Sequence, residues 1–407
     1  MKVVFIHQNM PGQYKHLAAS LAADPANQVV FITRRASYAM PGVRRIVYQP
    51  HRGPEKSIHP YLRSTEDAIL HGQEVARVLL TLRKEGFVPD VIVGHPGWGE
   101  ALFIKDAFPA TPYLNYCEFY YGAEGRDFNF DPAFPPTLDA RLALRVRSTA
   151  LLHAALICDR GVAPTFWQRE THPAVFQDKI AVIHDGVDTT ALQPDPAAVF
   201  IFADGRKLTR KDKVVTYVAR NLEPYRGFPT FMRALPLILD AAPAAQVLII
   251  GGDETSYGGK PRNAANWREA MLAETGLKSD RVHFMGRLPY DQYRAALLVS
   301  SVHVYLTYPF VLSWSMLEAM AMGCLIVGSD TAPVREVIED GVNGLLTDFF
   351  SHQRLAGKVA EILRAPDDFA PLRLAARRTV ETRYALADCL PRQISLISEM
   401  AGFGSCG

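Results

Sequence analysis

The sequence has little of several features that would point to particular protein classes. Its five cysteines are scattered without a Cys-x-x-Cys pair, which argues against a disulfide framework or a zinc site and favours a reducing compartment such as the cytoplasm. No run approaches the roughly 20 apolar residues of a membrane span, and the apolar residues 3–6 are too few for the core of a signal peptide. The formal net charge of +2 argues against a general polyanion-binding protein.

The sequence also lacks the patterns of common metal and nucleophile sites. There is no Asp-x-Asp triplet, and His, Asp and Glu do not recur at metal-ligand spacing. No Ser-His-Asp or Cys-His arrangement stands out. We therefore expect no metal and no resident cofactor, so that arginines and helix ends neutralise any anionic group of a substrate.

What the sequence does contain is a repeated alternation of buried strands and helices. A chain of 407 residues with 48% hydrophobic residues is expected to form two domains. Continuously apolar runs, typical of parallel strands, lie at residues 3–6, 29–33 and 91–94 and recur at 214–219, 246–251, 282–285, 303–306 and 325–328. The pattern predicts an α/β fold with two Rossmann-like doubly wound domains, at residues 1–185 and 213–385. Residues 186–212, rich in proline and charge, are expected to be a linker.

One segment of the second domain has the features of a ligand-binding helix. Residues 313–323 begin with Ser313, Trp314 and Ser315, continue with strong helix formers and stop at a glycine. Main-chain amides at such a helix start suit a diphosphate, and Glu318, about one turn further on, suits the hydroxyls of a sugar. The alternative is a capped core helix with a solvated glutamate.

Two arginines follow the first strand of the same domain. Arg220 closes that strand, and Arg226 stands six residues later, just before a glycine. Ligands bind at the carboxyl ends of strands in open α/β sheets, and guanidinium groups match phosphate oxygens. The alternative is a surface arginine paired with Glu223.

Taken in order, these motifs resemble the second domain of family 4 retaining glycosyltransferases with the GT-B architecture. The family has two basic residues near a glycine, a strand ending in Gly-Arg, a Glu-containing helix followed by Gly-Cys, and a closing turn and strand. The matching residues are Arg220, Arg226, Arg287 with Leu288, Glu318, Cys324 and the segment 340–346. The resemblance covers roughly residues 210–365 strongly and the first half of the chain more weakly.

The resemblance implies two domains facing an interdomain cleft, with a final helix in residues 386–407 that packs back on the first domain before a frayed tail. It implies transfer of a sugar from a UDP- or GDP-sugar to a hydroxyl acceptor (a glycan, a lipid-linked or a small molecule) with retention of configuration, without a metal, in glycan or glycoconjugate biosynthesis.

The resemblance also implies roles for single residues. Arg220 and Arg226 would hold the diphosphate, and Ser313 to Ser315 would cover it. Glu318 would bind the ribose, and the backbone at Arg287 and Leu288 would line the base. One position departs from the family. Phe310 stands where relatives have a glutamate that reaches the donor sugar, which leaves that sugar unassigned.

Three residues of the first half are candidates for the sugar and acceptor side. Gly12, which follows the first strand and opens a helix, is a candidate for binding the donor, and its alternative is a tight turn. His95 ends a strand in a glycine-rich loop, where the family has a histidine that touches the transferred sugar; the alternative is a structural histidine. Glu118 follows another strand and suits an acceptor hydroxyl, against the alternative of a partly buried structural glutamate.

A basic stretch with Tyr38 and Tyr48 interleaved suits an anionic acceptor or a peripheral contact at the inner face of the membrane, although such stretches are more often solvated loops. Its basic residues are Arg34, Arg35, Arg44, Arg45, Arg52 and Lys56. Its aromatic residues are too sparse for nucleic-acid binding. Two functional alternatives stay open: a sugar-nucleotide epimerase on the same fold, and a nucleotide-sugar-binding protein without turnover.

Overall fold

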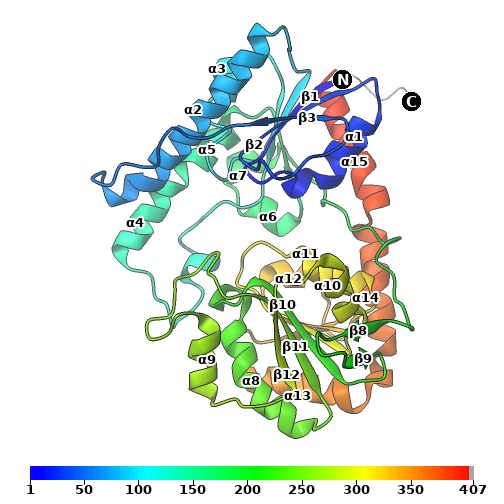
Figure 1. Ribbon diagram of the computed structural model, residues 1–407. Helices are drawn as coiled ribbons and strands as arrows, with labels where there is room; N and C mark the ends of the chain where they lie inside the picture. Colours follow the sequence, from blue (N-terminus) through cyan, green and yellow to red (C-terminus); the bar gives the residue numbers. More distant parts are fainter. Residues whose placement is uncertain (403–407) are drawn as a thin grey trace. The chain divides into compact units, whose positions relative to one another are not determined.

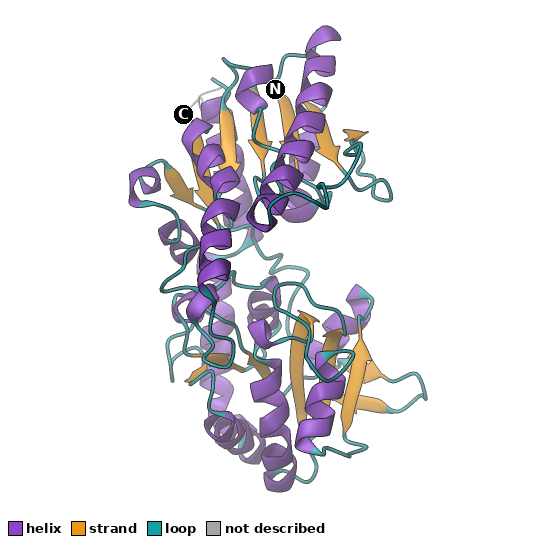
Figure 2. Cartoon of the chain, turned by 90° about the vertical axis from the view of Figure 1, so that its left-hand side faces the viewer, coloured by secondary structure: helices purple, strands orange, loops and turns teal. Residues whose placement is uncertain are grey.

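The computed structural model describes residues 1–402, which divide into two compact units. Unit 1 comprises Met1–Gly186 together with the chain from Leu386 onward, and unit 2 comprises Val187–Ala385. Both are built on a fully parallel sheet, and Figure 2 shows helices on both faces of the strands. The tail expected to fray lies largely outside the described residues.

Unit 1 contains a seven-stranded sheet in the order β3-β2-β1-β4-β5-β6-β7. The strands are β1 (Lys2–Ile6), β2 (Gln28–Thr33), β3 (Val43–Val47), β4 (Val91–Gly94), β5 (Tyr113–Tyr116), β6 (Arg160–Ala163) and β7 (Ile180–Val182). The helices are α1 (Lys15–Ala23), α2 (Arg63–Lys84), α3 (Ile104–Ala107), α4 (Leu138–Arg147), α5 (Thr149–Ile157), α6 (Phe166–Glu170), α7 (Ala174–Gln177) and α15 (Leu386–Met400). β1, β2 and β4 are buried on both faces, and apart from Lys2, Gln28 and Thr33 their residues form continuous apolar runs.

The last helix, α15, belongs to unit 1 although its sequence follows unit 2. It lies beside α1 (Figure 1), and its Leu396 and Ile397 are buried in the same cluster as Leu17 and Ala18 of α1. Burial of these apolar side chains holds the end of the chain against the first sheet.

Unit 2 contains a six-stranded sheet in the order β12-β11-β10-β13-β14-β15. The strands are β10 (Val214–Asn221), β11 (Gln246–Gly252), β12 (Val282–Gly286), β13 (Val302–Tyr305), β14 (Ile326–Ser329) and β15 (Leu345–Thr347). The helices are α8 (Phe228–Ala241), α9 (Trp267–Thr275), α10 (Tyr290–Leu298), α11 (Trp314–Ala321), α12 (Ala332–Arg335), α13 (His352–Arg364) and α14 (Ala370–Arg383). The chain passes from β10 to β11 on one side and returns to β13 on the other, so a topological switch point lies between β10 and β13.

The expectation that residues 186–212 form a linker is wrong. Residues 187–212 belong to unit 2 and include the antiparallel hairpin of β8 (Val199–Ile201) and β9 (Lys207–Thr209). Phe200 and Leu208 are buried in one cluster with Val214 and Leu248 of the main sheet. Three-residue strands are too short to show a periodicity, so the sequence reads as irregular although the segment is packed.

Candidate active site

The polar residues of unit 2 gather at the carboxyl ends of β10 and β13, on either side of the switch point. Arg226 ends the short 3-10 turn Pro224–Arg226 that follows β10 and is 8% exposed. Its Nη1 donates hydrogen bonds to Thr307 Oγ1 (2.8 Å), to the carbonyl oxygen of Val311 (2.9 Å) and to Tyr305 Oη (3.4 Å). The turn and the segment after β13 are therefore joined by one guanidinium group.

The surroundings of Arg226 are aromatic and uncharged. The rings of Tyr257 and Phe310 have their centroids 5.6 Å and 5.9 Å from its Cζ, and its hydrogen-bond acceptors are all neutral. Within residues 1–402 Arg226 forms no ion pair. Because a buried charge without a counter-charge is unfavourable, the site favours an anionic ligand.

The N-terminus of α11 is connected to the same arginine through Tyr305. Tyr305 Oη accepts a hydrogen bond from the main-chain N–H of Ser313 (2.7 Å) as well as from Arg226. Ser313 is the N-cap, and its Oγ accepts from the N–H of Ser315 (3.4 Å), as the sequence predicts for a helix start. Two of the amides expected to cover phosphates therefore already have protein partners, while Trp314 between them is 43% exposed.

Arg220 and Arg287 make no direct contact with Arg226 in the described part of the chain. Arg220 lies near the end of β10 with an exposed side chain that has no hydrogen bond or ion pair within residues 1–402. Arg287, after β12, donates to Glu254 Oε2 (2.6 Å) and to Asn221 Oδ1 (2.9 Å), while Leu288 packs against a core cluster. Arg287 also borders a surface pocket of about 660 Å³ at the carboxyl end of β11.

Glu318 lies on α11, where both of its carboxylate oxygens accept hydrogen bonds from tyrosine hydroxyls of α10. Tyr293 donates to Oε2 (2.6 Å) and Tyr290 donates to Oε1 (3.2 Å). The carboxylate is therefore held in one orientation.

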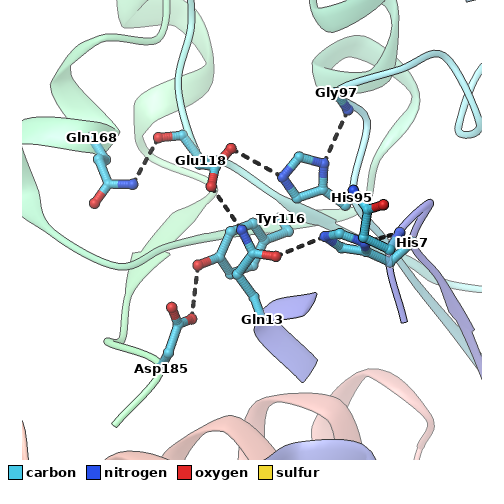
Figure 3. Close-up of polar contacts among 9 residues, drawn as sticks. His7, Gln13, His95, Gly97, Tyr116, Glu118, Gln168 and Asp185 are labelled. Atoms are coloured by element: carbon cyan, nitrogen blue, oxygen red, sulfur yellow. Dashed lines mark hydrogen bonds and ion pairs between the residues drawn. The ribbon is translucent and has the colours of Figure 1, made fainter. Parts of the chain in front are cut away.

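In unit 1 the central strands β1, β4 and β5 end in a hydrogen-bonded cluster (Figure 3). Glu118 Oε1 accepts from Gln13 Nε2 (2.7 Å), and Glu118 Oε2 lies 3.3 Å from His95 Nε2. His7 Nε2 lies 2.7 Å from Gln13 Oε1, and the ring centroids of His7 and His95 are 4.8 Å apart. Gln168 of α6 donates to the main-chain oxygen of Glu118 (2.8 Å).

The main-chain amides around the cluster define which imidazole nitrogens carry hydrogen. The N–H of Asn9 donates to His7 Nδ1 (2.9 Å), and the N–H of Gly97 donates to His95 Nδ1 (3.1 Å). Each ring therefore carries a hydrogen on Nε2 and donates it, His7 to Gln13 and His95 to Glu118. Burial and the neighbouring His95 lower the pKa of His7 to about 3, so His7 is neutral at physiological pH.

Glu118 is ionised in this arrangement. Burial alone would raise the pKa of its carboxyl group, but the hydrogen bond from His95, the electrostatic interactions with His95 and His7, and the hydrogen bond from Gln13 together outweigh burial and leave the pKa below its ordinary value. The side chain of Glu118 is 33% exposed, whereas that of His95 is 3% exposed. The carboxylate is therefore the member of this pair that is open to a substrate.

Gly12 is required by its neighbour His7. Its φ is +52°, and a Cβ at this position would lie 2.5 Å from His7 Nε2. A side chain there would displace the ring that orients Gln13.

The structure thus brings together several of the residues that the sequence singles out. Arg226 is linked to Ser313, and His95 contacts Glu118 directly. Sequence reasoning missed the histidine and the tyrosines that position them: His7, Tyr257, Tyr290, Tyr293 and Tyr305. His7 follows a predicted strand and could be found by the same logic as His95, whereas the tyrosines carry no local signal.

The basic stretch of unit 1 does not form one open cationic surface. Arg44 pairs with Glu85 (2.8 Å) and Arg52 with Glu66 (2.7 Å), while Arg35 donates to the main-chain oxygen of Met10. Within residues 1–402 no helix has the length and hydrophobicity needed to cross a membrane. The same residues include no group of three or more His, Cys, Asp or Glu side chains arranged to hold a metal ion.

Two parallel α/β units with polar side chains at the ends of their central strands define a two-domain Rossmann-like protein. A sucrose-phosphate synthase from Thermosynechococcus elongatus has this fold and aligns over 99% of both chains, with a TM-score of 0.75 and 17% identity. Anabaena HepE in complex with UDP-glucose aligns over 98% of this chain and 100% of its own, with a TM-score of 0.68 and 16% identity. The fold is therefore GT-B.

Family models extend the comparison to sequence. The model "Glycosyl transferase family 4 group" matches residues 25–192, and "Glycosyl transferases group 1" matches residues 202–379. Together they match most of the chain, which therefore belongs to the family 4 glycosyltransferases with the GT-B fold.

Curated relatives match part of the chain. A D-inositol 3-phosphate glycosyltransferase from Mycolicibacterium vanbaalenii is 30% identical over 46% of this chain and 41% of its own length. A phosphatidyl-myo-inositol mannosyltransferase from Mycobacterium leprae is 28% identical over 49% of this chain and 47% of its own length. The chain spans about half the length of the curated relatives it matches.

Proposed function

We propose that the protein transfers a sugar from a nucleoside-diphosphate sugar to a hydroxyl acceptor, with retention of configuration and without a metal ion. The observation that carries this proposal is the buried guanidinium of Arg226, which is bonded to neutral oxygens and has no counter-charge within residues 1–402. A diphosphate would supply that charge, and its bond to arginine would be strengthened by exclusion of water. Membership in a glycosyltransferase family supports the same substrate class.

On the donor side, Arg226 binds one phosphate from the turn after β10, and the exposed Arg220 binds the other from the end of that strand. The N-terminus of α11 adds its dipole at Ser313 and Ser315. Glu318 binds the ribose hydroxyls, and the backbone at Arg287 and Leu288 lines the base. The leaving diphosphate is thus neutralised by arginines and main-chain dipoles.

On the acceptor side, the partly exposed carboxylate of Glu118 orients the attacking hydroxyl, and the buried His95 holds that carboxylate in place. The bond from the anomeric carbon to the phosphate oxygen breaks as the bond to the acceptor oxygen forms on the same face. The proton of the acceptor hydroxyl passes to the departing phosphate oxygen. In this scheme Arg220, Arg226 and Glu318 contact the donor, His95 acts through Glu118, and Gly12 permits the close packing of the first loop on His7.

The proposal is tested by incubating the full chain with UDP- and GDP-sugars, with and without EDTA, and with pools of glycan, lipid-linked and small-molecule acceptors. We expect donor consumption that depends on an acceptor, survives EDTA and gives a product with the donor's anomeric configuration by proton NMR. Epimerised donor without acceptor would identify an epimerase instead. Tight nucleotide binding with no donor consumed in any pool would identify a binding protein.

Thermal-shift measurements test the diphosphate assignment separately, because a ligand that binds only the folded state stabilises it. We expect Arg220→Ala to abolish the shift produced by UDP or GDP. An unchanged shift in that variant would remove Arg220 from the site.

A further inference from the structure

The two tyrosines that hold Glu318 differ in their surroundings. Tyr293 packs against the main core cluster of unit 2, and its hydroxyl lies 2.6 Å from Glu318 Oε2. Tyr290 is 51% exposed, and its hydroxyl lies 3.2 Å from Oε1. One oxygen of the carboxylate is therefore bound from the protein interior, and the other is bound from the solvent side.

This difference implies unequal strengths for the two hydrogen bonds. A short bond from a packed hydroxyl to a carboxylate is a strong, charge-assisted interaction. The longer bond from the exposed Tyr290 competes with water and is easily exchanged for another hydroxyl. Burial and the nearby Glu318 carboxylate raise the pKa of the Tyr290 hydroxyl above its usual value of 10, so the hydroxyl is protonated and acts as a donor.

A ribose presents hydroxyl donors of the same kind as Tyr290. A ribose hydroxyl that donates to Oε1 competes there with the Tyr290 hydroxyl, whose bond of 3.2 Å is the longer of the two and comes from a half-exposed side chain. The bond from Tyr293 to Oε2 can persist, since it comes from the packed side of α10. The two tyrosines would then affect nucleotide binding in opposite directions.

We propose that Tyr293 is a positioning residue that fixes the Glu318 carboxylate for the ribose of the donor, and that the Tyr290 hydroxyl is a placeholder that the ribose displaces. This inference rests on the proposed role of Glu318 in binding the donor nucleotide. It adds two residues that determine how tightly the ribose of the donor is bound.

The experiment measures binding of UDP and GDP to the full chain by isothermal titration calorimetry. Tyr290→Phe removes a bond that binding would otherwise have to break, so we expect about two- to tenfold tighter binding of the nucleotide that the wild type prefers. Tyr293→Phe frees the carboxylate, so we expect binding about tenfold weaker or more. Circular dichroism establishes that each variant is folded.

Two further variants make the result unambiguous. Tyr61→Phe removes a tyrosine hydroxyl that donates to Asp139 in unit 1, and we expect it to leave nucleotide affinity unchanged. Glu318→Gln should weaken binding. With the matching 2′-deoxynucleotide, the gain from Tyr290→Phe should shrink if the 2′-hydroxyl is the displacing group.

The outcomes separate the two proposals. If Glu318→Gln leaves affinity unchanged, the ribose assignment of Glu318 is wrong, and the inference falls with it. If Glu318→Gln weakens binding but Tyr290→Phe leaves it unchanged or also weakens it, the donor assignment stands and the placeholder role is refuted. A tighter Tyr290→Phe variant is not expected from a merely structural tyrosine.

Discussion

The contact between Gly12 and His7 leads to a prediction whose size follows from the geometry. In Gly12→Ala the new Cβ would meet three atoms of the His7 ring at 2.5–2.8 Å, and the backbone has φ of +52°. A left-handed conformation at a non-glycine residue costs about 1–2 kcal/mol, and overpacking of a buried site typically costs about 1–3 kcal/mol. We therefore expect Gly12→Ala to lower the free energy of unfolding of unit 1 by about 2–5 kcal/mol.

Gly86→Ala is the matched control in the same unit. Gly86 has φ of +79°, and a Cβ there meets nothing within 4 Å. It should therefore show only the conformational cost of about 1–2 kcal/mol. In calorimetric thermal unfolding, Gly12→Ala should therefore lower the unfolding midpoint about 1.5 to 4 times as far as Gly86→Ala. Equal shifts would refute the close packing of Gly12 on His7.

Three other predictions follow from buried polar groups. His303 is fully buried, and burial lowers its pKa to about 3. Between pH 6.5 and pH 3, His303 is therefore protonated in the unfolded chain but neutral in the folded protein. The free energy of unfolding should therefore fall as the pH is lowered from 6.5 toward 3. In equilibrium denaturation, His303→Gln should reduce the slope of this free energy against pH by about 1.4 kcal/mol per pH unit. An unchanged slope would contradict this. Glu223 is fully buried and accepts hydrogen bonds from the main-chain amides of Ser256, Tyr257 and Gly258. Glu223→Gln should therefore destabilise the folded form of this loop by about 1–3 kcal/mol and speed tryptic cleavage after the exposed Arg262. Equal cleavage rates would argue that Glu223 does not hold the loop. A carbon-13 NMR titration of Glu118 should give a midpoint below the ordinary 4.5, because hydrogen bonds and electrostatic interactions with its neighbours, His95 first, overcome burial. A midpoint above 4.5 would contradict this.

Most of the fold could be predicted because its strands are buried on both faces. The run at residues 3–6 is continuously apolar for that reason, and the start of α11 could be placed at Ser313 from its capping residues. The hairpin of β8 and β9 was missed because its strands have only three residues each, and in β9 the buried Leu208 stands between two polar residues, so neither strand shows a periodicity. Its place in unit 2 is set by contacts with the main sheet, which a local pattern does not encode.

The candidate site was predictable where it depends on the ends of strands. His95 and Glu118 follow neighbouring strands, so parallel pairing brings them to the same edge, where they lie 3.3 Å apart. Tyr257 could not be linked to Arg226 in the same way, because it lies in a loop whose path is fixed by the distant Glu223. Which aromatic ring covers a charge depends on such tertiary contacts.

The central claim is that the buried charge of Arg226 is balanced by the diphosphate of a nucleotide. Calorimetric titration of UDP and GDP into the wild type, Arg226→Met and Arg233→Met tests it most directly, since Arg233 is an exposed arginine of the same unit paired with Glu274. We predict that Arg226→Met weakens nucleotide binding by about 100-fold or more, from the loss of charged hydrogen bonds worth about 1.5–3 kcal/mol each, while Arg233→Met binds like the wild type. Equal affinities of Arg226→Met and the wild type would contradict the account.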